Sequence, residues 1–219
     1  AIAKMNLFLH GASDFNVMQG DTLRDPKILQ GGNIAKFDCV IANPPFSLEN
    51  WGATEWSSDK YKRNIYGTPS DSCGDYAWIQ HMICSMSSGK GRMAVVMPQG
   101  ILFRGNQEAE IRKQLVESNL IEAVVTLGDK LFYGTGLSPC FLIIRRMKQA
   151  HHSGLILMID GSQILTQKRA QNILEENDID RLYSLYQNYS DEEDYSRIVT
   201  LQEIRDKEYN LSPNRYVVH

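Results

Sequence analysis

The fold is decided by one stretch, Phe37-Asp38-Cys39-Val40-Ile41-Ala42-Asn43-Pro44-Pro45-Phe46. Its first six residues are apolar and β-branched enough to predict a buried strand of a parallel sheet. The two prolines then end that strand, because neither can donate a hydrogen bond to a strand ladder. Asn43 therefore lies at the carboxyl end of a predicted parallel strand, which is where open α/β sheets bind their ligands.

Apolar runs and helical periods alternate along the rest of the chain. Besides 37–42, strands are expected at 15–19, 92–97, 120–127, 140–144 and 155–159, and helices at 1–10, 75–88 and 106–118. This alternation predicts an α/β fold with a mainly parallel sheet and helices on both faces. Residues 47–74 form a long polar connection, and connections of that length usually have a function or are mobile.

The character of the chain changes near residue 163. We expect residues 1–162 to be the catalytic part of the domain, and residues 163–219 to be a helical and polar extension of the same domain. Within that extension, residues 167–189 look helical and residues 190–194 are acidic.

The composition is that of an ordinary globular domain, with 219 residues, 42% hydrophobic and 22% charged residues. The net charge is −3, whereas a protein that holds many phosphates alone is usually basic. If nucleic acid is the substrate, we expect a partner or a missing segment to supply much of the contact. The four cysteines show no CxxC spacing, and the histidines show no ligand spacing, so neither a metal site nor a disulfide framework is expected. Scattered cysteines favour a reduced, cytoplasmic setting, and no apolar run approaches the ~20 residues needed to cross a bilayer.

The tetrapeptide Asn43-Pro44-Pro45-Phe46 suits methyl transfer to an exocyclic amine. The N6 amine of adenine is a poor nucleophile, because its lone pair is delocalised into the ring. Two acceptors, the Asn43 side-chain oxygen and the Pro44 carbonyl, could hold the two N–H bonds and direct the lone pair at a methyl donor. Phe46 would stack on the base, which must leave the duplex to react. The structural alternative is a strand that ends in a rigid Pro-Pro turn with a surface aromatic.

Two further segments have a functional and a structural reading. Asp21, in Gly20-Asp21-Thr22-Leu23, could accept a hydrogen bond from the adenine of a cofactor, or it could cap the next turn. Phe132, which precedes a glycine loop at 133–136, could reach the other face of an extruded base, or it could be a core side chain. For both residues the structural reading is favoured when the residue is taken alone. The glycine loop does not match the phosphate-binding motif GxxxxGK[ST].

Basic residues give a weaker signal. Lys60, Lys62 and Arg63 lie in the long connection after the tetrapeptide, and they are candidates for contact with DNA. Arg145, Arg146 and Lys148, at the end of a predicted strand, fit a solvated edge better than a DNA contact.

Several stretches together match one family in its order. They are residues 5–11, 20–23, 37–47, 75–82, 100–105, 131–135 and 210–216. With them the chain closely resembles the modification subunit of type I restriction–modification systems, a gamma-type N6-adenine DNA methyltransferase. The resemblance covers nearly the whole sequence and implies a Rossmann-like methyltransferase sheet.

The resemblance also implies roles for individual residues. Asn43, Pro44, Pro45 and Phe46 match the catalytic motif, and Asn43 and Pro45 are expected to contact the methyl donor as well. Asp21, with Thr22 beside it, matches the residue that binds the adenine of S-adenosylmethionine. Phe132 resembles the aromatic residue that packs on the extruded adenine. Implied partners are DNA, a specificity subunit and a restriction subunit.

One departure from the family qualifies these expectations. The glycine-containing cofactor loop of the type DPxCGSGG does not occur in the sequence. We therefore expect a sheet that is incomplete in its N-terminal half, a chain that belongs to a longer protein, and little activity from these residues alone. Two alternatives stay open: a non-catalytic module that holds the specificity subunit or DNA, and a methyltransferase that acts on protein glutamine or on RNA.

Overall fold

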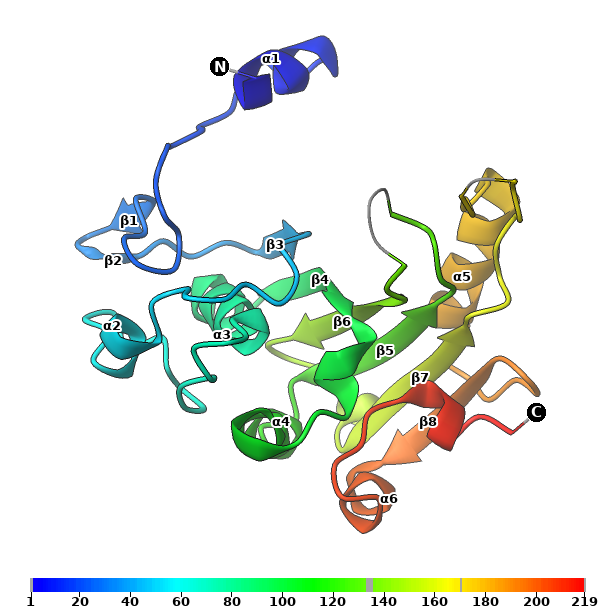
Figure 1. Cartoon of the computed structure of the whole chain (residues 1–219). Coiled ribbons are helices and arrows are strands. Elements are labelled where there is room, and N and C mark those ends of the chain that lie inside the picture. The colour runs from blue at the N-terminus through cyan, green and yellow to red at the C-terminus, as the bar shows by residue number, and fades with distance from the viewer. Residues whose placement is uncertain (1, 133–135, 170, 219) are drawn as a thin grey trace.

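The computed structural model describes residues 2–132, 136–169 and 171–218, in which the main feature is a six-stranded sheet (Figure 1). The order across the sheet is β3-β4-β6-β5-β7-β8. The strands are β3 Cys39–Ala42, β4 Arg92–Pro98, β5 Ile121–Leu127, β6 Pro139–Arg145, β7 Leu155–Gly161 and β8 Ser196–Thr200. Five of these correspond to strands that the sequence predicts, and β8 lies in the C-terminal segment, where none is predicted.

The sheet is mixed, which corrects the expectation of a mainly parallel one. β3 runs parallel to β4, and β5 runs parallel to β7. β6 is antiparallel to both of its neighbours, and β8 is antiparallel to β7. The physical reason lies in the connection from β5 to β6 over residues 128–138, whose described part contains no crossover helix. A parallel return normally needs such a crossover, so β6 returns in the opposite direction.

Helices cover both faces of the sheet, as the sequence predicts. The bounds are α3 Asp75–Ser85, α4 Asn106–Glu117, α5 Glu176–Asn188 and α6 Leu201–Asp206. The apolar sides of α3, α4 and α6 share one buried cluster with Val124 of β5. Ala123 and Val125, which point to the opposite face of β5, share the other cluster with Leu185 of α5. Because side chains alternate along a strand, β5 packs against a helical layer on each side.

Shorter helical segments connect these elements. They are α2 Ala53–Ser57 in the long connection and three 3₁₀ turns, η1 Gln99–Leu102, η2 Ala150–His152 and η3 Pro213–Arg215. Among the residues that the structure describes, no helix combines the length and hydropathy needed to cross a bilayer. The expected boundary between residues 162 and 163 stays a prediction.

The N-terminal region differs from the sequence prediction in two places. Residues 15–19 form no strand, because no described segment pairs with them. The predicted loop at 24–36 instead contains a hairpin of β1 Leu29–Gln30 and β2 Asn33–Ile34. Its turn residues Gly31 and Gly32 have φ angles of 57° and 79°, which glycine adopts without strain in a type I′ turn. The expected first helix is present as α1 Ile2–Leu9, which has no buried residue and stands clear of the sheet in Figure 1.

β3 is an edge strand in the described structure. It pairs only with β4 within the described residues, and Ile41 is 77% exposed on the face away from α3. Val40, on the opposite face, packs against the core cluster that contains α3. The expectation of a parallel strand is confirmed, whereas the expectation of a strand buried on both faces is wrong for this structure.

Candidate active site

The tetrapeptide follows β3 directly, at the edge of the sheet where β3 and β4 both end. Asn43 and Pro45 are exposed, Pro44 is buried and Phe46 is half-buried. In the described part of the chain, the Asn43 side-chain amide and the Pro44 carbonyl have no hydrogen-bond partner. The prolines prevent further strand pairing, so these two acceptors are left free at the end of the sheet.

Phe46 and Phe132 lie against each other. Their ring centroids are 6.2 Å apart and the ring planes meet at 86°, which is an edge-to-face pair. The sequence names both residues as candidates to stack on a base, and the structure brings them to one place from two distant segments. Residues 133–135 of the adjoining glycine loop lie outside the described residues.

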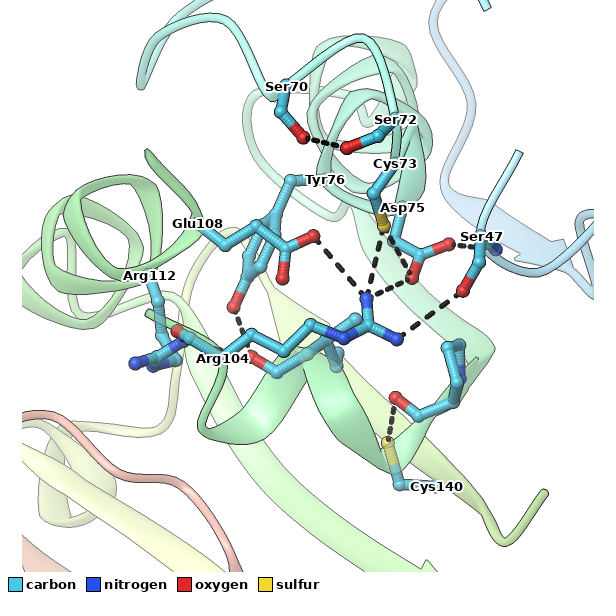
Figure 2. A network of polar contacts seen from close by, with 12 residues as sticks. Ser47, Ser70, Ser72, Cys73, Asp75, Tyr76, Arg104, Glu108, Arg112 and Cys140 are labelled. Carbon is cyan, nitrogen blue, oxygen red and sulfur yellow. Dashed lines mark hydrogen bonds and ion pairs between the residues drawn. The ribbon is translucent and has the colours of Figure 1, made fainter. Parts of the chain in front are cut away.

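A buried carboxylate lies behind the tetrapeptide. Asp75, the first residue of α3, is 0% exposed. Its Oδ1 accepts the backbone N–H of Ser47 at 2.7 Å, and its Oδ2 accepts Nη1 of Arg104 at 2.9 Å (Figure 2). The N-terminal end of a helix favours a negative charge, so the start of α3 suits this carboxylate. Asp75 thus connects the residue after the tetrapeptide to a helix of the core.

Arg104 completes this group from the segment that follows η1. Besides Asp75, its Nη1 donates to Cys73 Sγ at 3.1 Å and to Glu108 Oε1 at 3.4 Å, while its Nη2 donates to Ser47 Oγ at 3.4 Å (Figure 2). The pKa of Arg104 is raised above its ordinary value. Burial alone would lower this pKa, but the hydrogen bond to Asp75 and the charge of Glu108 together outweigh burial. The guanidinium is therefore a fixed positive charge.

The same group has the composition of a cation site. Ligand atoms of Cys73, Asp75 and Glu108 all lie within 4.8 Å of one another. The Arg104 guanidinium already lies among them and supplies the positive charge. Burial and a hydrogen bond with Glu108 raise the pKa of the Cys73 thiol to about 12, so it is a poor metal ligand at neutral pH. The expectation that no metal takes part stays a prediction.

The Asp21 turn is the second predicted site segment. Asp21 Oδ1 accepts the backbone N–H groups of Leu23 and Arg24, each at 3.0 Å, and Oδ2 pairs with the Arg24 guanidinium at 3.3 Å. This is the capping arrangement that the sequence leaves as the structural alternative. The Asp21 side chain remains 48% exposed, so the same carboxylate can accept further hydrogen bonds.

Arg63 supports this turn from the protein interior, and its position removes it from the candidates for contact with DNA. The Arg63 side chain is 1% exposed and pairs with Asp59 at 2.7 Å. It donates to the carbonyls of Thr22 and Leu23 at 2.8 Å and 2.6 Å, and it lies over the ring of Trp56. A guanidinium with these partners is not available to a phosphate. Lys60 and Lys62 are exposed and remain candidates.

A cavity of about 200 Å³ lies beside the Asp21 turn, lined among others by Gly20, Thr22, Val40 and His81. Burial and the charge of Arg63 lower the pKa of His81 to about 4, so its ring is neutral near pH 7. Asn43 and Phe46 do not line this cavity. The Asp21 turn and the tetrapeptide are therefore separate features of the described surface.

The basic group at the end of β6 is structural. Arg145 pairs with the buried Glu122 at 2.8 Å, and Arg146 donates to the Ile83 carbonyl at 2.6 Å. Lys148 donates to the carbonyl of Leu155 at 2.8 Å. These contacts agree with the preference against a DNA contact, but the side chains are held by the protein rather than merely solvated.

Sequence reasoning missed the Asp75–Arg104 pair as part of the site. Both residues lie in stretches that support the family resemblance, 75–82 and 100–105, and that was the available signal. The pairing itself joins residues 29 positions apart, and nothing in the local pattern predicts it.

Comparison with known proteins gives a consistent result. A family model described as N-6 DNA Methylase matches residues 1–219. The chain is 36% identical over 227 residues to the type I restriction enzyme MjaVII methylase subunit of Methanocaldococcus jannaschii, covering 99% of this chain and 38% of that protein. It is 30% identical over 225 residues to the HindI methylase subunit of Haemophilus influenzae, covering 99% and 49% of the two chains.

Among solved structures, the methyltransferase subunit of a type I restriction–modification system from Streptococcus thermophilus superposes with a TM-score of 0.89 at 29% identity. That match covers 99% of this chain and 46% of the other. The chain therefore spans less than half the length of each of these relatives.

Proposed function

Because the chain belongs to the N-6 DNA methylase family, we propose that it carries the base-binding part of an enzyme that methylates the N6 amine of adenine in DNA. The methyl donor is S-adenosylmethionine, and the whole protein is the modification subunit of a type I restriction–modification complex. One observation carries the proposal: the free acceptors of Asn43 and Pro44 lie at the end of β3, beside the Phe46–Phe132 pair.

The two acceptors account for the chemistry at the amine. The Asn43 side-chain oxygen and the Pro44 carbonyl each accept one N–H of the target amine and draw its nitrogen toward a tetrahedral shape. The nitrogen lone pair would then attack the methyl carbon while the bond from that carbon to sulfur breaks, which releases S-adenosylhomocysteine. The methylated amine would then lose one proton to water. No strong base is required, because position and electrostatics lower the barrier. The rigid Pro44-Pro45 backbone fixes the carbonyl before the base arrives.

The aromatic pair accounts for the extruded base. A base between two rings needs about 3.5 Å on each side, so the rings must lie roughly 7 Å apart and parallel. Phe46 and Phe132 are 6.2 Å apart and perpendicular. We therefore expect the Phe132 ring to rotate and move away from Phe46 when the base enters. The adenine would then pack against Phe46 in the place that Phe132 occupies in this structure.

We assign fewer residues to binding of the methyl donor than to binding of the target base. S-adenosylmethionine supplies an electrophilic methyl group on a positively charged sulfur. The half-exposed carboxylate of Asp21 fits the adenine amine of this molecule, with Thr22 beside it and with Asn43 and Pro45 near the methyl group. The sequence holds no glycine loop of the type DPxCGSGG. We propose that these 219 residues alone bind the donor weakly and transfer methyl groups slowly or not at all.

The proposed partners follow from the net charge of the chain and from its relatives. A net charge of −3 suits a subunit that shares the DNA contact with others. A separate specificity subunit reads the sequence, a restriction subunit cleaves, and the complex works in the cytoplasm. The relatives named above are methylase subunits of type I restriction enzymes, and they support this assignment.

The test is transfer of isotope-labelled methyl groups to DNA by the complex of the protein with its specificity subunit. Mass spectrometry of the digested DNA should find the label on N6-methyladenine for the wild type and not for Asn43→Ala. Asn188→Ala, an exposed amide on α5, is the matched control and should retain activity. Label on cytosine, or full activity in Asn43→Ala, would contradict the proposal. Label on RNA or on glutamine of a protein would favour the alternative substrates instead.

A further inference from the structure

The residue after the tetrapeptide adopts a backbone conformation that needs support. Ser47 has φ of 49°, in the left-handed region that side-chain-bearing residues rarely occupy. Such a conformation persists only where the surroundings hold it. Here two contacts hold it: the Ser47 N–H donates to Asp75 at 2.7 Å, and the Ser47 Oγ accepts from Arg104 at 3.4 Å.

These contacts matter because few other hydrogen bonds hold the backbone of the tetrapeptide in the described structure. Pro44 and Pro45 have no N–H to donate, so the chain between Asn43 and Ser47 cannot be fixed through them. At one end the tetrapeptide continues from β3, which pairs with β4. At the other end, the described structure anchors the backbone at the Ser47 N–H. The direction of the Pro44 carbonyl is therefore set by the strand before it and by Asp75 after it.

The Asp75–Arg104 pair is itself rigidly mounted. The Arg104 carbonyl accepts from Arg112 at 2.7 Å, and Arg112 donates also to the carbonyls of Ile101 at 3.3 Å and Tyr209 at 2.9 Å. The Tyr76 hydroxyl donates to the Ile101 carbonyl at 2.7 Å. Tyr76 of α3 and Arg112 of α4, both labelled in Figure 2, thus hold the segment that bears Arg104. Asp75 and its partner Arg104 are therefore connected to two helices of the core.

From this geometry we propose that Asp75 and Arg104 are positioning residues for methyl transfer, which hold the Asn43–Phe46 segment in its reactive conformation through Ser47. The proposal rests on the proposed function. Asp75 holds the backbone through the Ser47 N–H, and Arg104 holds the Asp75 carboxylate in place through its own hydrogen bond. Neither residue touches the base. Their loss should lower the rate of methyl transfer and leave the affinity for S-adenosylmethionine unchanged.

The first test measures position without any reaction. Amide hydrogen exchange of the protein should be followed in a peptide that covers residues 43–48, where the two prolines contribute no amide. In Asp75→Asn and Arg104→Ala we expect this peptide to exchange about tenfold faster than in the wild type. Glu122→Gln is the matched control, because Glu122 is also a buried carboxylate paired with an arginine, Arg145. Glu122 lies at the start of β5, whereas the tetrapeptide follows the end of β3. It should leave the peptide unchanged.

The second test measures rate, with the complex used for the methyl-transfer assay. Arg104→Ala should lower kcat about 100-fold with little change in KM for S-adenosylmethionine. The Arg104 side chain is 34% exposed, and an open cavity of about 600 Å³ adjoins it beside Cys73 and Glu108. Added guanidinium ion can therefore enter the gap in Arg104→Ala, and it should restore part of kcat. It should not restore Asn43→Ala.

The outcomes separate the two proposals. Faster exchange in the 43–48 peptide, with loss of kcat and recovery by guanidinium, supports the positioning role. Unchanged exchange in Asp75→Asn and Arg104→Ala would overturn it, and so would a loss of kcat that Glu122→Gln shares or that guanidinium leaves untouched. If the wild type methylates no adenine, the proposed function fails, and the exchange experiment still decides whether Asp75 holds the segment.

Discussion

The two loops predicted to form the site differ in what their polar side chains already do. In the tetrapeptide, the Asn43 amide and the Pro44 carbonyl have no partner within the described residues. In the second loop, both oxygens of Asp21 are engaged by Leu23 and Arg24. The first loop therefore has acceptors that are free among the described residues, and the second has a carboxylate that already caps its own turn.

The support beneath the two loops is similar. Arg104 pairs with Asp75 behind the tetrapeptide, and Arg63 pairs with Asp59 behind the Asp21 turn. Both arginines connect the loop to the core from below, one through Ser47 and the other through the carbonyl of Thr22. In both loops, then, an arginine paired with a buried carboxylate holds the backbone. The loops differ in their acceptors: those of Asn43 and Pro44 have no partner among the described residues, whereas those of Asp21 hold its own turn.

The largest effect is expected beneath the Asp21 turn. Arg63→Ala leaves the buried Asp59 carboxylate without its cation and leaves two carbonyls unpaired, so the free energy of unfolding should fall by about 3–5 kcal/mol. Urea denaturation measures this loss. Arg24→Ala, which removes an exposed pair with Asp21, should cost less than about 1 kcal/mol. Equal losses in the two variants would show that Arg63 does not hold the turn.

The stability of the fold should depend on pH through His81, which lies beside the Asp21 turn. In the folded protein the pKa of His81 lies at about 4, against an ordinary 6.5, because of burial and then the charge of Arg63. Between these values the unfolded ring takes a proton that the folded ring refuses, so stability falls as the pH drops from 6.5 toward 4. The contribution of His81 to this loss should be about 2–3 kcal/mol. Comparison of His81→Gln with the wild type at several pH values isolates it, and parallel pH profiles would contradict the assignment.

On the tetrapeptide side, the aromatic pair should affect activity more than stability. Phe46→Ala and Phe132→Ala each remove one ring from the base, and base–aromatic stacking contributes about 1–3 kcal/mol, so kcat/KM for DNA should fall roughly 10- to 100-fold. Phe141→Leu, on the face of the sheet packed by α5, should retain it. Unaltered methyl transfer in both alanine variants would exclude stacking by this pair.

The smallest expected effect on stability separates the capping role of Asp21 from the role of its charge. Asp21→Asn keeps an oxygen that can accept from Leu23 and Arg24, so stability should change by only a few tenths of a kcal/mol. Asp21→Ala loses the cap and should cost about 1 kcal/mol. Thermal unfolding of the two variants measures the difference. A loss as large in Asp21→Asn as in Asp21→Ala would mean that charge rather than capping holds the turn.

The parts of this fold that could be predicted are those with local signals. The apolar runs ended by Pro98 or by turns became strands, and the amphipathic period of 106–118 became α4. The tetrapeptide stands where its prolines predict, directly after β3. The sequence also named Phe46 and Phe132 together, although only their shared family pattern connected them.

The parts that could not be predicted depend on distant partners. The antiparallel direction of β6 depends on how residues 128–138 return, and residue types do not encode it. Residues 15–19 have a strand-like sequence but no described strand beside them. Arg63 looks like a surface residue of a basic run until Asp59 and Trp56 enclose it. In the same way, Asp75 resembles an ordinary helix cap, and only the fold brings Ser47 and Arg104 to it.

The most direct measurement of the central claim is the steady-state kinetics of adenine methylation by the complex, for the wild type, Asn43→Ala and Asp21→Asn. The structure predicts that Asn43→Ala lowers kcat about 10³-fold with little change in KM for S-adenosylmethionine, because a transition-state acceptor is lost. Asp21→Asn should instead raise that KM and nearly retain kcat. Wild-type kcat in Asn43→Ala would contradict the claim that the tetrapeptide holds the reacting amine.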